Sequence, residues 1–455
     1  MIDIIKQSTM SRRSFLTRSA LTLGAAASAN TLLAACGSST STSGGTTTLT
    51  VMYTSSEFTS AYISEFEKLN PGIKINFVAL DQTHLTAMLA SGNPPDFVEG
   101  TGVTDLPNLA ARGLALNLDP YLAKSTVLKK SDLQPINDVW RFDGKVEGQG
   151  SYYGIVKDYS QDSTIWFNKK LFDQAKVPYP SETEPLTYDQ VLEIGRKLTV
   201  RQGGKTQVFG FDALWANPSV TSPSLMQMIQ QQGSTLFSMD LTTADFTAPE
   251  ALKALQWYVD YAQAHVGSSP LDPNPDGWDG PLFLADRVAI TYAGFWFGGE
   301  IATDTHGLAD HVGFAPALQM GSQRLSSCFG AVGSWIPAAS KNPDAAWKVM
   351  EYFHGGKPAQ DRAQGGWGLP ALASLVSEVP RSKPYQAQAF QTQQQEAPYF
   401  GLLHMSPYIT VDALFASVSK YLQQAMNGQL TVAAAARQMT DDVNAQLQRG
   451  KQQVG

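Results

Sequence analysis

The residues of this sequence that could do chemistry are carboxylates and tryptophans. Glu57 follows one predicted strand and Glu99 stands at the end of another, so we expect both carboxylates at the carboxyl-end edge of a sheet. Such a pair could act as the acid and base of a glycoside hydrolase, or it could accept hydrogen bonds from ligand hydroxyls. We interpret the two as ligand-binding groups, because hydrolysis would need a raised pKa and a fixed spacing that a sequence does not show.

Tryptophan could supply the apolar half of a sugar site, because the C–H faces of a pyranose ring stack on flat aromatic rings. Nine tryptophans are present. Trp140, Trp257, Trp335 and Trp347 are predicted in the core, and Trp166 lies within a predicted strand. Trp278 lies in a turn-rich loop, where burying an indole needs a reason, so it is a candidate for ligand contact.

Polar side chains that follow predicted strands, or lie in loops, complete the set of candidates. Ligands of α/β proteins bind at the carboxyl ends of strands, where carboxylates and hydroxyls can face them. Beyond Glu57 and Glu99, these ligand-binding candidates are Ser55, Ser56, Asp81, Thr101, Asp158 and Tyr159.

Other kinds of site have little support. The six histidines are scattered, and no His, Cys, Asp or Glu cluster has the spacing of metal ligands, so we expect neither a metal nor a cofactor. Cys328 could serve as a nucleophile with a distant histidine, but we interpret it as a small apolar strand residue. The formal net charge of −7, with no basic cluster after the first residues, argues against nucleic acid as a partner.

The first residues resemble an export signal. Arg12 and Arg13 precede Phe15 and a short apolar stretch, as in a twin-arginine signal, and Leu33–Cys36 resembles a lipobox. We therefore expect residues 1–35 to be a signal peptide and Cys36 to carry lipid. Residues 36–48 are typical of a flexible tether. The protein is then expected at the extracytoplasmic face of the bacterial cytoplasmic membrane, held there by the lipid anchor alone.

Strands and helices alternate along the rest of the chain. Strands are predicted over 48–54, 73–80, 94–100, 163–169 and 287–296, and helices over 83–90 and 106–112. Capping-box patterns at Thr187–Gln190 and Thr247–Glu250 predict two further helix starts. This alternation predicts an α/β fold with a parallel sheet.

Several segments together resemble the extracellular solute-binding proteins that serve ABC importers, in their maltose-binding-protein-like branch. The resemblance rests on motifs in family order: LASGNPPDFVE, YYGIVKDYSQDSTIWFNKKLFDQAKV, PLTYDQVLEIGRKLT, FLADRVAITYAGFW, GAVGSWIPAASKNPDAAWKVMEYF and NGQLTVAAAARQMTDDVNAQL. Val156 and Phe295 depart from the family pattern, each where a proline is usual.

The resemblance implies a two-lobed periplasmic-binding-protein type II fold with a hinge and an interlobe cleft that closes on the ligand. The first lobe would comprise residues 49–158 and 330–372, and the second lobe residues 159–329 and 373–455. The chain would cross between lobes near residues 157–161, 329–333 and 369–375.

The resemblance also implies further residues for ligand contact. Trp296 matches the family's turn tryptophan, and Trp367 lies beside the third crossing. Trp215 lies in a loop that faces the cleft in relatives, and Tyr408 lies in a region that contributes an aromatic there.

The implied function is capture of a carbohydrate, an oligosaccharide or a polyol, and its delivery to the permease of an ABC importer without chemistry on the ligand. We expect a monomer. Within the same fold, the ligand could instead be a polyol phosphate, a polyamine or a metal chelate. Arginine is scarce in the candidate loops, which disfavours a phosphate.

Overall fold

The computed structural model describes residues 45–212, 221–274 and 277–454, and residues 45–455 form one compact unit. The predicted signal peptide, Cys36 and Trp215 lie outside the described residues. The β-strands are β1 (Thr47–Tyr53), β2 (Ile73–Ala79), β3 (Phe97–Thr101), β4 (Arg141–Phe142), β5 (Ser151–Tyr152), β6 (Gly154–Val156), β7 (Asp158–Tyr159), β8 (Ile165–Asn168), β9 (Val200–Gln202), β10 (Lys205–Val208), β11 (Ile290–Thr291), β12 (Val312–Ala315), β13 (Val332–Trp335) and β14 (Leu369–Pro370).

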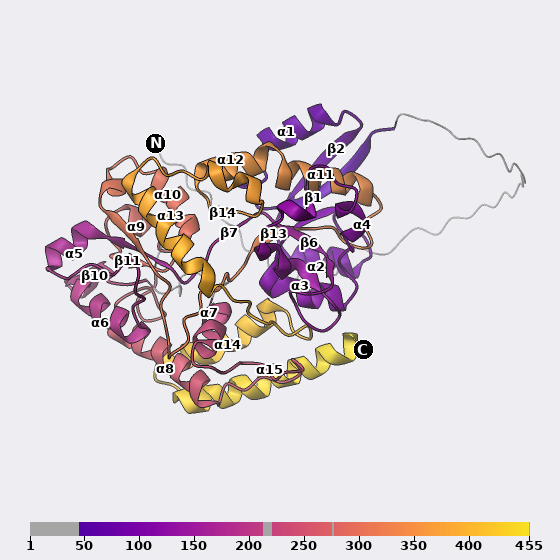
Figure 1. Cartoon of the computed structure of the whole chain (residues 1–455). Helices are drawn as coiled ribbons and strands as arrows, with labels where there is room; N and C mark the ends of the chain where they lie inside the picture. Colours follow the sequence, from indigo (N-terminus) through magenta and orange to yellow (C-terminus); the bar gives the residue numbers. More distant parts are fainter. Residues whose placement is uncertain (1–44, 213–220, 275–276, 455) are drawn as a thin grey trace, which may run out of the picture. The chain divides into compact units, whose positions relative to one another are not determined.

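The helices connect and cover these strands (Figure 1). The α-helices are α1 (Ser60–Leu69), α2 (Gln82–Ala90), α3 (Gly102–Ala111), α4 (Asp119–Leu122), α5 (Lys169–Ala175), α6 (Tyr188–Leu198), α7 (Thr221–Gln230), α8 (Pro249–Ala264), α9 (Gly280–Leu284), α10 (Gly298–Ala302), α11 (Pro343–Gly355), α12 (Lys357–Gly365), α13 (Pro384–Glu396), α14 (Val411–Met426) and α15 (Val432–Val454). The 3₁₀ helices are η1 (Lys130–Asp132), η2 (Pro135–Trp140), η4 (Phe295–Phe297), η5 (Leu308–Asp310), η6 (Ala373–Glu378) and η7 (Ala397–Tyr399).

The larger sheet has five strands in the order β2-β1-β3-β13-β6. β1 pairs in parallel with β2 and β3, as the strand–helix alternation predicts. β13 is antiparallel to both β3 and β6. The predicted parallel sheet is therefore confirmed for β2, β1 and β3, and wrong for the pairings of β13. A strand from far downstream enters the sheet in the reverse direction, and no local pattern signals that pairing.

The helices around this sheet come from two distant parts of the sequence. In Figure 1 the orange helices α11 and α12 pack beside the indigo strands, and α11 contacts β1, β3 and β6. Leu49, Phe66, Phe97, Trp347 and Phe353 are buried together there. The larger sheet with α1–α4, α11 and α12 is called the first lobe below.

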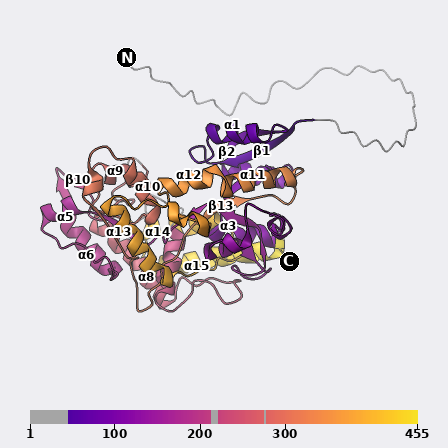
Figure 2. The same ribbon diagram turned by 45° about the horizontal axis from the view of Figure 1, so that its top comes forward.

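The second lobe contains the smaller sheet and the remaining α-helices, α5–α10 and α13–α15. Its strand order is β11-β8-β12, and both pairs are antiparallel. The predicted strand over 287–296 shrinks to β11, because the chain turns at Gly294 (φ 70°) into η4. Helix α13 packs on β12, and α7 and α15 each pack against both α8 and α14. Helices α8, α14 and α15 lie together in two views (Figures 1 and 2).

The chain passes between the two sheets at positions that define the candidate site. β6 belongs to the larger sheet and β8 to the smaller one, and β7 between them pairs with β14. β12 and β13 make a second passage in the opposite direction. The segment boundaries of the lobes remain a prediction.

Local sequence signals account for several of these elements. Thr187 and Gln190 form the predicted capping box at the start of α6. The box predicted at Thr247 is wrong: Ala248 is the N-cap of α8 without a side-chain hydrogen bond, and the Thr247 hydroxyl donates to Asp245 instead. Four tryptophans predicted in the core are buried: Trp140, Trp257, Trp335 and Trp347.

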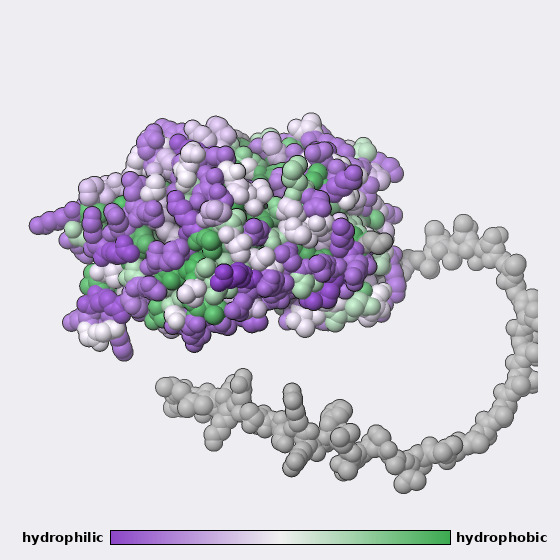
Figure 3. Space-filling view, turned by 90° about the horizontal axis from the view of Figure 1, so that it is seen from below, coloured by the Kyte–Doolittle hydropathy of each residue, from purple (hydrophilic) through white to green (hydrophobic). Residues whose placement is uncertain are grey.

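Hydrophilic residues cover much of the face that Figure 3 shows, with small groups of hydrophobic residues among them. Within the described residues, no helix has the length and apolarity needed to span a membrane.

Candidate ligand-binding site

Four side chains of alternating charge meet at the carboxyl end of β1 and at the first passage between the sheets. Lys157 forms an ion pair with Glu57, and its Nζ lies 3.6 Å from Asp158 Oδ2. Arg362 Nε, from α12, lies 3.6 Å from the same oxygen. We call Glu57, Lys157, Asp158 and Arg362 the charge cluster. Their side chains are between 6% and 32% exposed, so the cluster is largely shielded from water.

Burial and neighbouring charges set the protonation of this cluster. Burial alone would lower the pKa of Lys157, but the carboxylates of Asp158 and Glu57 raise it above its ordinary value. Burial raises the pKa of Asp158, while Lys157 and Arg362 oppose that rise. Lys157 is therefore charged at neutral pH, and the two cations are matched by nearby carboxylates.

Glu99, at the end of β3, lies close to the charge cluster. The backbone N–H of Thr54 donates to Glu99 Oε2 at 2.6 Å. Burial, together with the charge of Glu57, raises the pKa of Glu99 above its usual range. The two glutamates that the sequence analysis paired are thus close enough to influence each other.

A buried hydrogen-bond relay supports the strands beneath Glu99. Ser334 Oγ donates to the hydroxyl of Tyr53 at 3.3 Å, and His354 Nε2 lies 2.8 Å from Ser334 Oγ. Burial holds the pKa of His354 well below its ordinary value, so this imidazole is neutral. The relay fixes β1 against β13 and so holds the carboxyl end of β1, where Glu57 follows.

Two turns that carry a tryptophan lie close to the segment that first passes between the sheets, and a glycine makes room for each close contact. A Cβ on Gly368 would lie 3.3 Å from Asp158 Cβ, and the preceding residue is Trp367. A Cβ on Gly294 would lie 2.6 Å from Ser160 Oγ, and Trp296 follows two residues later. The indole of Trp367 also packs on Gly299, three residues beyond Trp296. The structure therefore brings Asp158, Trp296 and Trp367 into one region.

The remaining aromatic candidates of this region are Trp278 and Tyr159. The indoles of Trp278 and Trp296 are stacked, with centroids 6.2 Å apart and planes 26° apart. Tyr159 lies in β7 opposite Leu369, and burial raises the pKa of its hydroxyl to about 12. Trp278 and Trp296 are half-buried and Trp367 is 38% exposed, so parts of these rings face solvent.

The other predicted residues lie apart from this group or have local roles. Ser55 and Ser56 are exposed in the turn after β1. Asp81 caps α2 by accepting a hydrogen bond from His84 N at 2.6 Å. Thr101 donates through its backbone and its hydroxyl to Asp105. The backbone of Tyr408 packs against Gly450 of α15.

Sequence reasoning missed three residues that this region uses. Lys157 stood in the predicted crossing but was not assigned to the site, and Arg362 and Asp162 were not singled out. Asp162 accepts hydrogen bonds from Ser160 Oγ and from Phe329 N, both at 2.6 Å, and so ties the two passages together. The Lys157–Asp158 dipeptide at a predicted crossing was a usable signal, whereas no local pattern pointed to Arg362.

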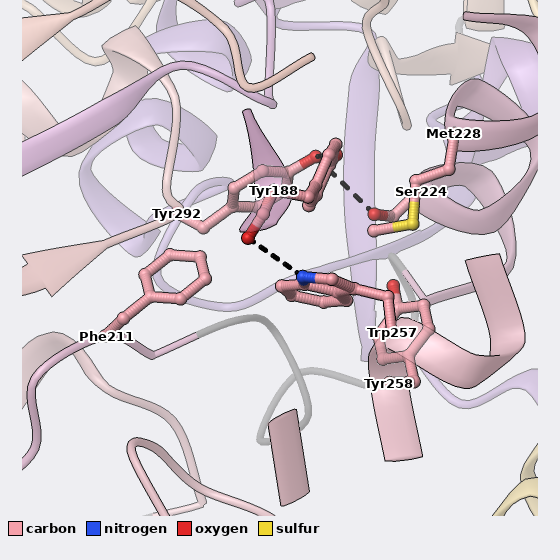
Figure 4. A pocket seen from close by; sticks show the side chains of 7 residues that line it. All are labelled: Tyr188, Phe211, Ser224, Met228, Trp257, Tyr258 and Tyr292. Atoms are coloured by element: carbon pink, nitrogen blue, oxygen red, sulfur yellow. Dashed lines mark hydrogen bonds between the residues drawn. The ribbon is translucent and has the colours of Figure 1, made fainter. Parts of the chain in front are cut away.

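A small cavity in the second lobe is not a ligand site. It encloses about 140 Å³ of empty volume, but no point in it accommodates a water molecule. Figure 4 shows the side chains that line it. The Trp257 indole donates to the Tyr188 carbonyl oxygen at 2.9 Å, and the hydroxyl groups of Ser224 and Tyr292 lie 3.5 Å apart. Its lining residues are Tyr188, Phe211, Ser224, Met228, Trp257, Tyr258 and Tyr292. Such a space is a packing defect of the core.

Among residues 45–212, 221–274 and 277–454, no group of three or more His, Cys, Asp or Glu side chains is arranged to hold a metal ion. The chemistry that the described site can offer is hydrogen bonding from fixed charges and stacking on indoles.

Comparison with known proteins places this geometry in a family. The family described as bacterial extracellular solute-binding protein matches residues 53–355. No curated protein matches the chain significantly.

Solved structures share the fold at low sequence identity. An ABC substrate-binding protein from Listeria monocytogenes in complex with cycloalternan is 22% identical, with a TM-score of 0.72, over 88% of this chain and 98% of the other. A solute-binding protein from Thermotoga lettingae bound with α-D-tagatose is 20% identical, with a TM-score of 0.71, over 88% and 100%. One from Agrobacterium vitis with D-mannitol is 21% identical, with a TM-score of 0.67, over 90% and 99%. The predicted two-lobed α/β solute-binding fold is confirmed.

Proposed function

The chain belongs to the bacterial extracellular solute-binding protein family, and from that premise we propose that it captures a carbohydrate and delivers it to an ABC importer. The observation that carries the proposal is the proximity of chain segments: Gly368, next to Trp367, lies against Asp158 of the charge cluster, and the Trp367 ring lies on Gly299, three residues beyond Trp296. Fixed carboxylates suit ligand hydroxyls, and indoles suit the faces of sugar rings.

The neighbours named above bind sugars or a polyol, which supports a ligand of that class. Arg362 and Lys157 bring cations to the site that the sequence analysis did not expect, but Asp158 and Glu57 already match their charges. A phosphate would have to compete with those carboxylates, so a neutral ligand fits better than a polyol phosphate.

We further propose that ligand binds in a cleft between two lobes that close over it. Residues 1–36 lie outside the described part of the chain. For them we propose a twin-arginine signal over residues 1–35 and a lipid on Cys36, which would hold the protein outside the cytoplasm. The partners would be the ligand and permease subunits, and the protein would act as a monomer.

We expect no turnover of the ligand, although Glu57 and Glu99 lie near each other. Glu57 is paired with Lys157, and Glu99 accepts a hydrogen bond from Thr54, so both carboxylates are held in place. The raised pKa of Glu99 would suit the acid of a hydrolase, but the second carboxylate would have to be free to act as base or nucleophile, and Glu57 is held by Lys157.

A thermal-shift screen with recovery of the ligand tests this function. The probes are cycloalternan, maltotriose, D-tagatose and D-mannitol, with spermidine and glycerol phosphate as the competing classes. A ligand at a hundred times its Kd stabilises by about 2.7 kcal/mol, which gives a clear shift in Tm. We expect a shift with a sugar or polyol that is recovered intact. A shift only with spermidine or the phosphate, or recovery of a cleaved sugar, would contradict the proposal.

A further inference from the structure

Trp278 lies on a loop that several contacts hold in place. Asp279 accepts a hydrogen bond from the hydroxyl of Thr291, a fully buried residue of β11. Asn274 Nδ2 donates to the carbonyl oxygen of Trp278 at 2.8 Å. Asp279 thus fastens the chain beside Trp278 to the smaller sheet, and Asn274 holds the carbonyl oxygen of Trp278.

The indole of Trp278 packs against Gly280, the first residue of α9. A Cβ on Gly280 would lie 2.1 Å from Cη2 and 2.3 Å from Cζ3 of Trp278, so only glycine leaves room for the ring there. Gly280 has an ordinary backbone conformation, so the requirement concerns space and not φ. The missing side chain at Gly280 therefore allows the Trp278 ring to occupy its position.

Trp278 and Phe297 contact the Trp296 ring from two directions. Trp278 is stacked on it with an angle of 26° between the planes, and Phe297 meets it edge-on at 84°, with centroids 5.6 Å apart. The backbone before Trp296 is fixed separately, because the indole of Trp166 donates to the carbonyl oxygen of Gly294 at 2.7 Å. Backbone and ring are thus held by different neighbours.

We propose that Trp278 is a positioning residue whose anchored indole fixes the plane of the Trp296 ring on which a sugar stacks. This inference rests on the proposed function, because it assigns the ligand to Trp296. A ring already fixed in its bound orientation loses little freedom when ligand arrives. Trp278 therefore raises affinity without being the ring on which the sugar stacks.

Four variants of the full chain separate positioning from a purely structural role. Their Kd values are measured by calorimetry with maltotriose and D-mannitol. Trp278→Ala should weaken binding between about twofold and tenfold, and Trp278→Phe should restore most of the loss. Gly280→Ala keeps the indole but displaces it, so it should weaken binding to a similar degree. The double variant Trp278→Ala/Gly280→Ala should bind no more weakly than Trp278→Ala alone, because the two changes act through one contact.

Wild-type Kd values in Trp278→Ala, or additive losses in the double variant, would overturn the inference. A lowered Tm with unchanged Kd would also overturn it, since that is the result of a merely structural role. If the wild type binds none of cycloalternan, maltotriose, D-tagatose and D-mannitol, the sugar assignment fails, and with it the role given to Trp278.

The ring pair is tested without ligand by near-ultraviolet circular dichroism. Two stacked indoles couple, so Trp278→Phe and Trp296→Phe should each remove the same couplet from the wild-type spectrum. Different losses in the two variants would show that the rings do not form a pair, whatever the protein binds. This readout separates failure of the inference from failure of the proposed function.

Discussion

The two lobes contribute different kinds of group to the candidate site. The first lobe brings the charge cluster and Glu99, which ion pairs and backbone hydrogen bonds hold. The second lobe brings Trp278 and Trp296, which stacking holds. Charges fix the direction of hydroxyls, whereas indoles offer apolar area with little direction of their own. The stacked indoles thus come from the second lobe and the charges from the polar region at the end of the first lobe, whereas Trp367, which follows α12, brings an indole to the side of the charges.

The largest expected effect concerns the buried cation of the polar half. Lys157→Met leaves the carboxylates of Glu57 and Asp158 without their shared partner in a largely buried place. We expect the free energy of unfolding to fall by about 3–5 kcal/mol, as measured by urea denaturation.

Lys74→Met is the matched control, because Lys74 pairs with Glu67 at a position where its side chain is 56% exposed. Exposed pairs contribute little, so this variant should unfold almost like the wild type. If both variants lost the same free energy of unfolding, the ion pairs of Lys157 would contribute no more than an exposed ion pair does.

On the aromatic half, Trp296→Ala should weaken sugar binding by roughly thirtyfold or more, the effect expected of a tryptophan at the centre of an interface. The reason is loss of the ring surface on which the sugar stacks. Calorimetry with maltotriose and D-mannitol measures the change. Trp347→Phe, in the core of the first lobe, should leave Kd unchanged. If Trp296→Ala retained wild-type affinity, the aromatic half would not be part of the site.

Asp162 lies between the two halves and gives stability a pH dependence. Burial raises its pKa to about 6, whereas the unfolded group titrates near 3.9. Between these values the folded protein holds a proton that the unfolded chain has lost, so the free energy of unfolding falls as pH rises from about 4 to about 6. The decline due to this group is on the order of 3 kcal/mol.

Urea denaturation between pH 4 and pH 7 measures this decline, and Asp162→Asn should reduce it. Part of the decline in the free energy of unfolding should remain in this variant, because burial also raises the pKa of Asp279 to about 6. Asp143→Asn, which changes an exposed carboxyl, should leave the decline in place. An identical slope in Asp162→Asn and in the wild type would remove Asp162 from this account.

The smallest expected effect is that of salt on affinity. If the charges of the polar half are matched internally and the ligand is neutral, Kd should change by less than about twofold between 0.05 and 0.5 M NaCl. A steep loss of affinity with salt would indicate a charged ligand and break the division of labour between the lobes.

Local sequence patterns predicted the parts of the molecule that local interactions determine. The capping box at Thr187 and the parallel pairing of β1 with its neighbours follow from patterns within short windows. The burial of Trp140 follows in the same way from its expected place on a helix face, and the structure confirms it.

Long-range pairings could not be predicted in this way. The antiparallel entry of β13, the contact of Arg362 with Asp158 and the stacking of Trp278 on Trp296 each join segments that no short pattern connects. The family resemblance indicated Trp296 by its turn, but it did not reveal the ring behind it.

The most direct test of the central claim is a calorimetric titration of the full chain with cycloalternan, maltotriose, D-tagatose and D-mannitol, repeated with Trp296→Ala and Asp158→Asn. We predict saturable one-to-one binding of at least one of these ligands, weakened by both substitutions, because the site draws on both lobes. Binding of a sugar that neither substitution alters would place the site elsewhere. Binding of none of them would contradict the assignment of a carbohydrate ligand.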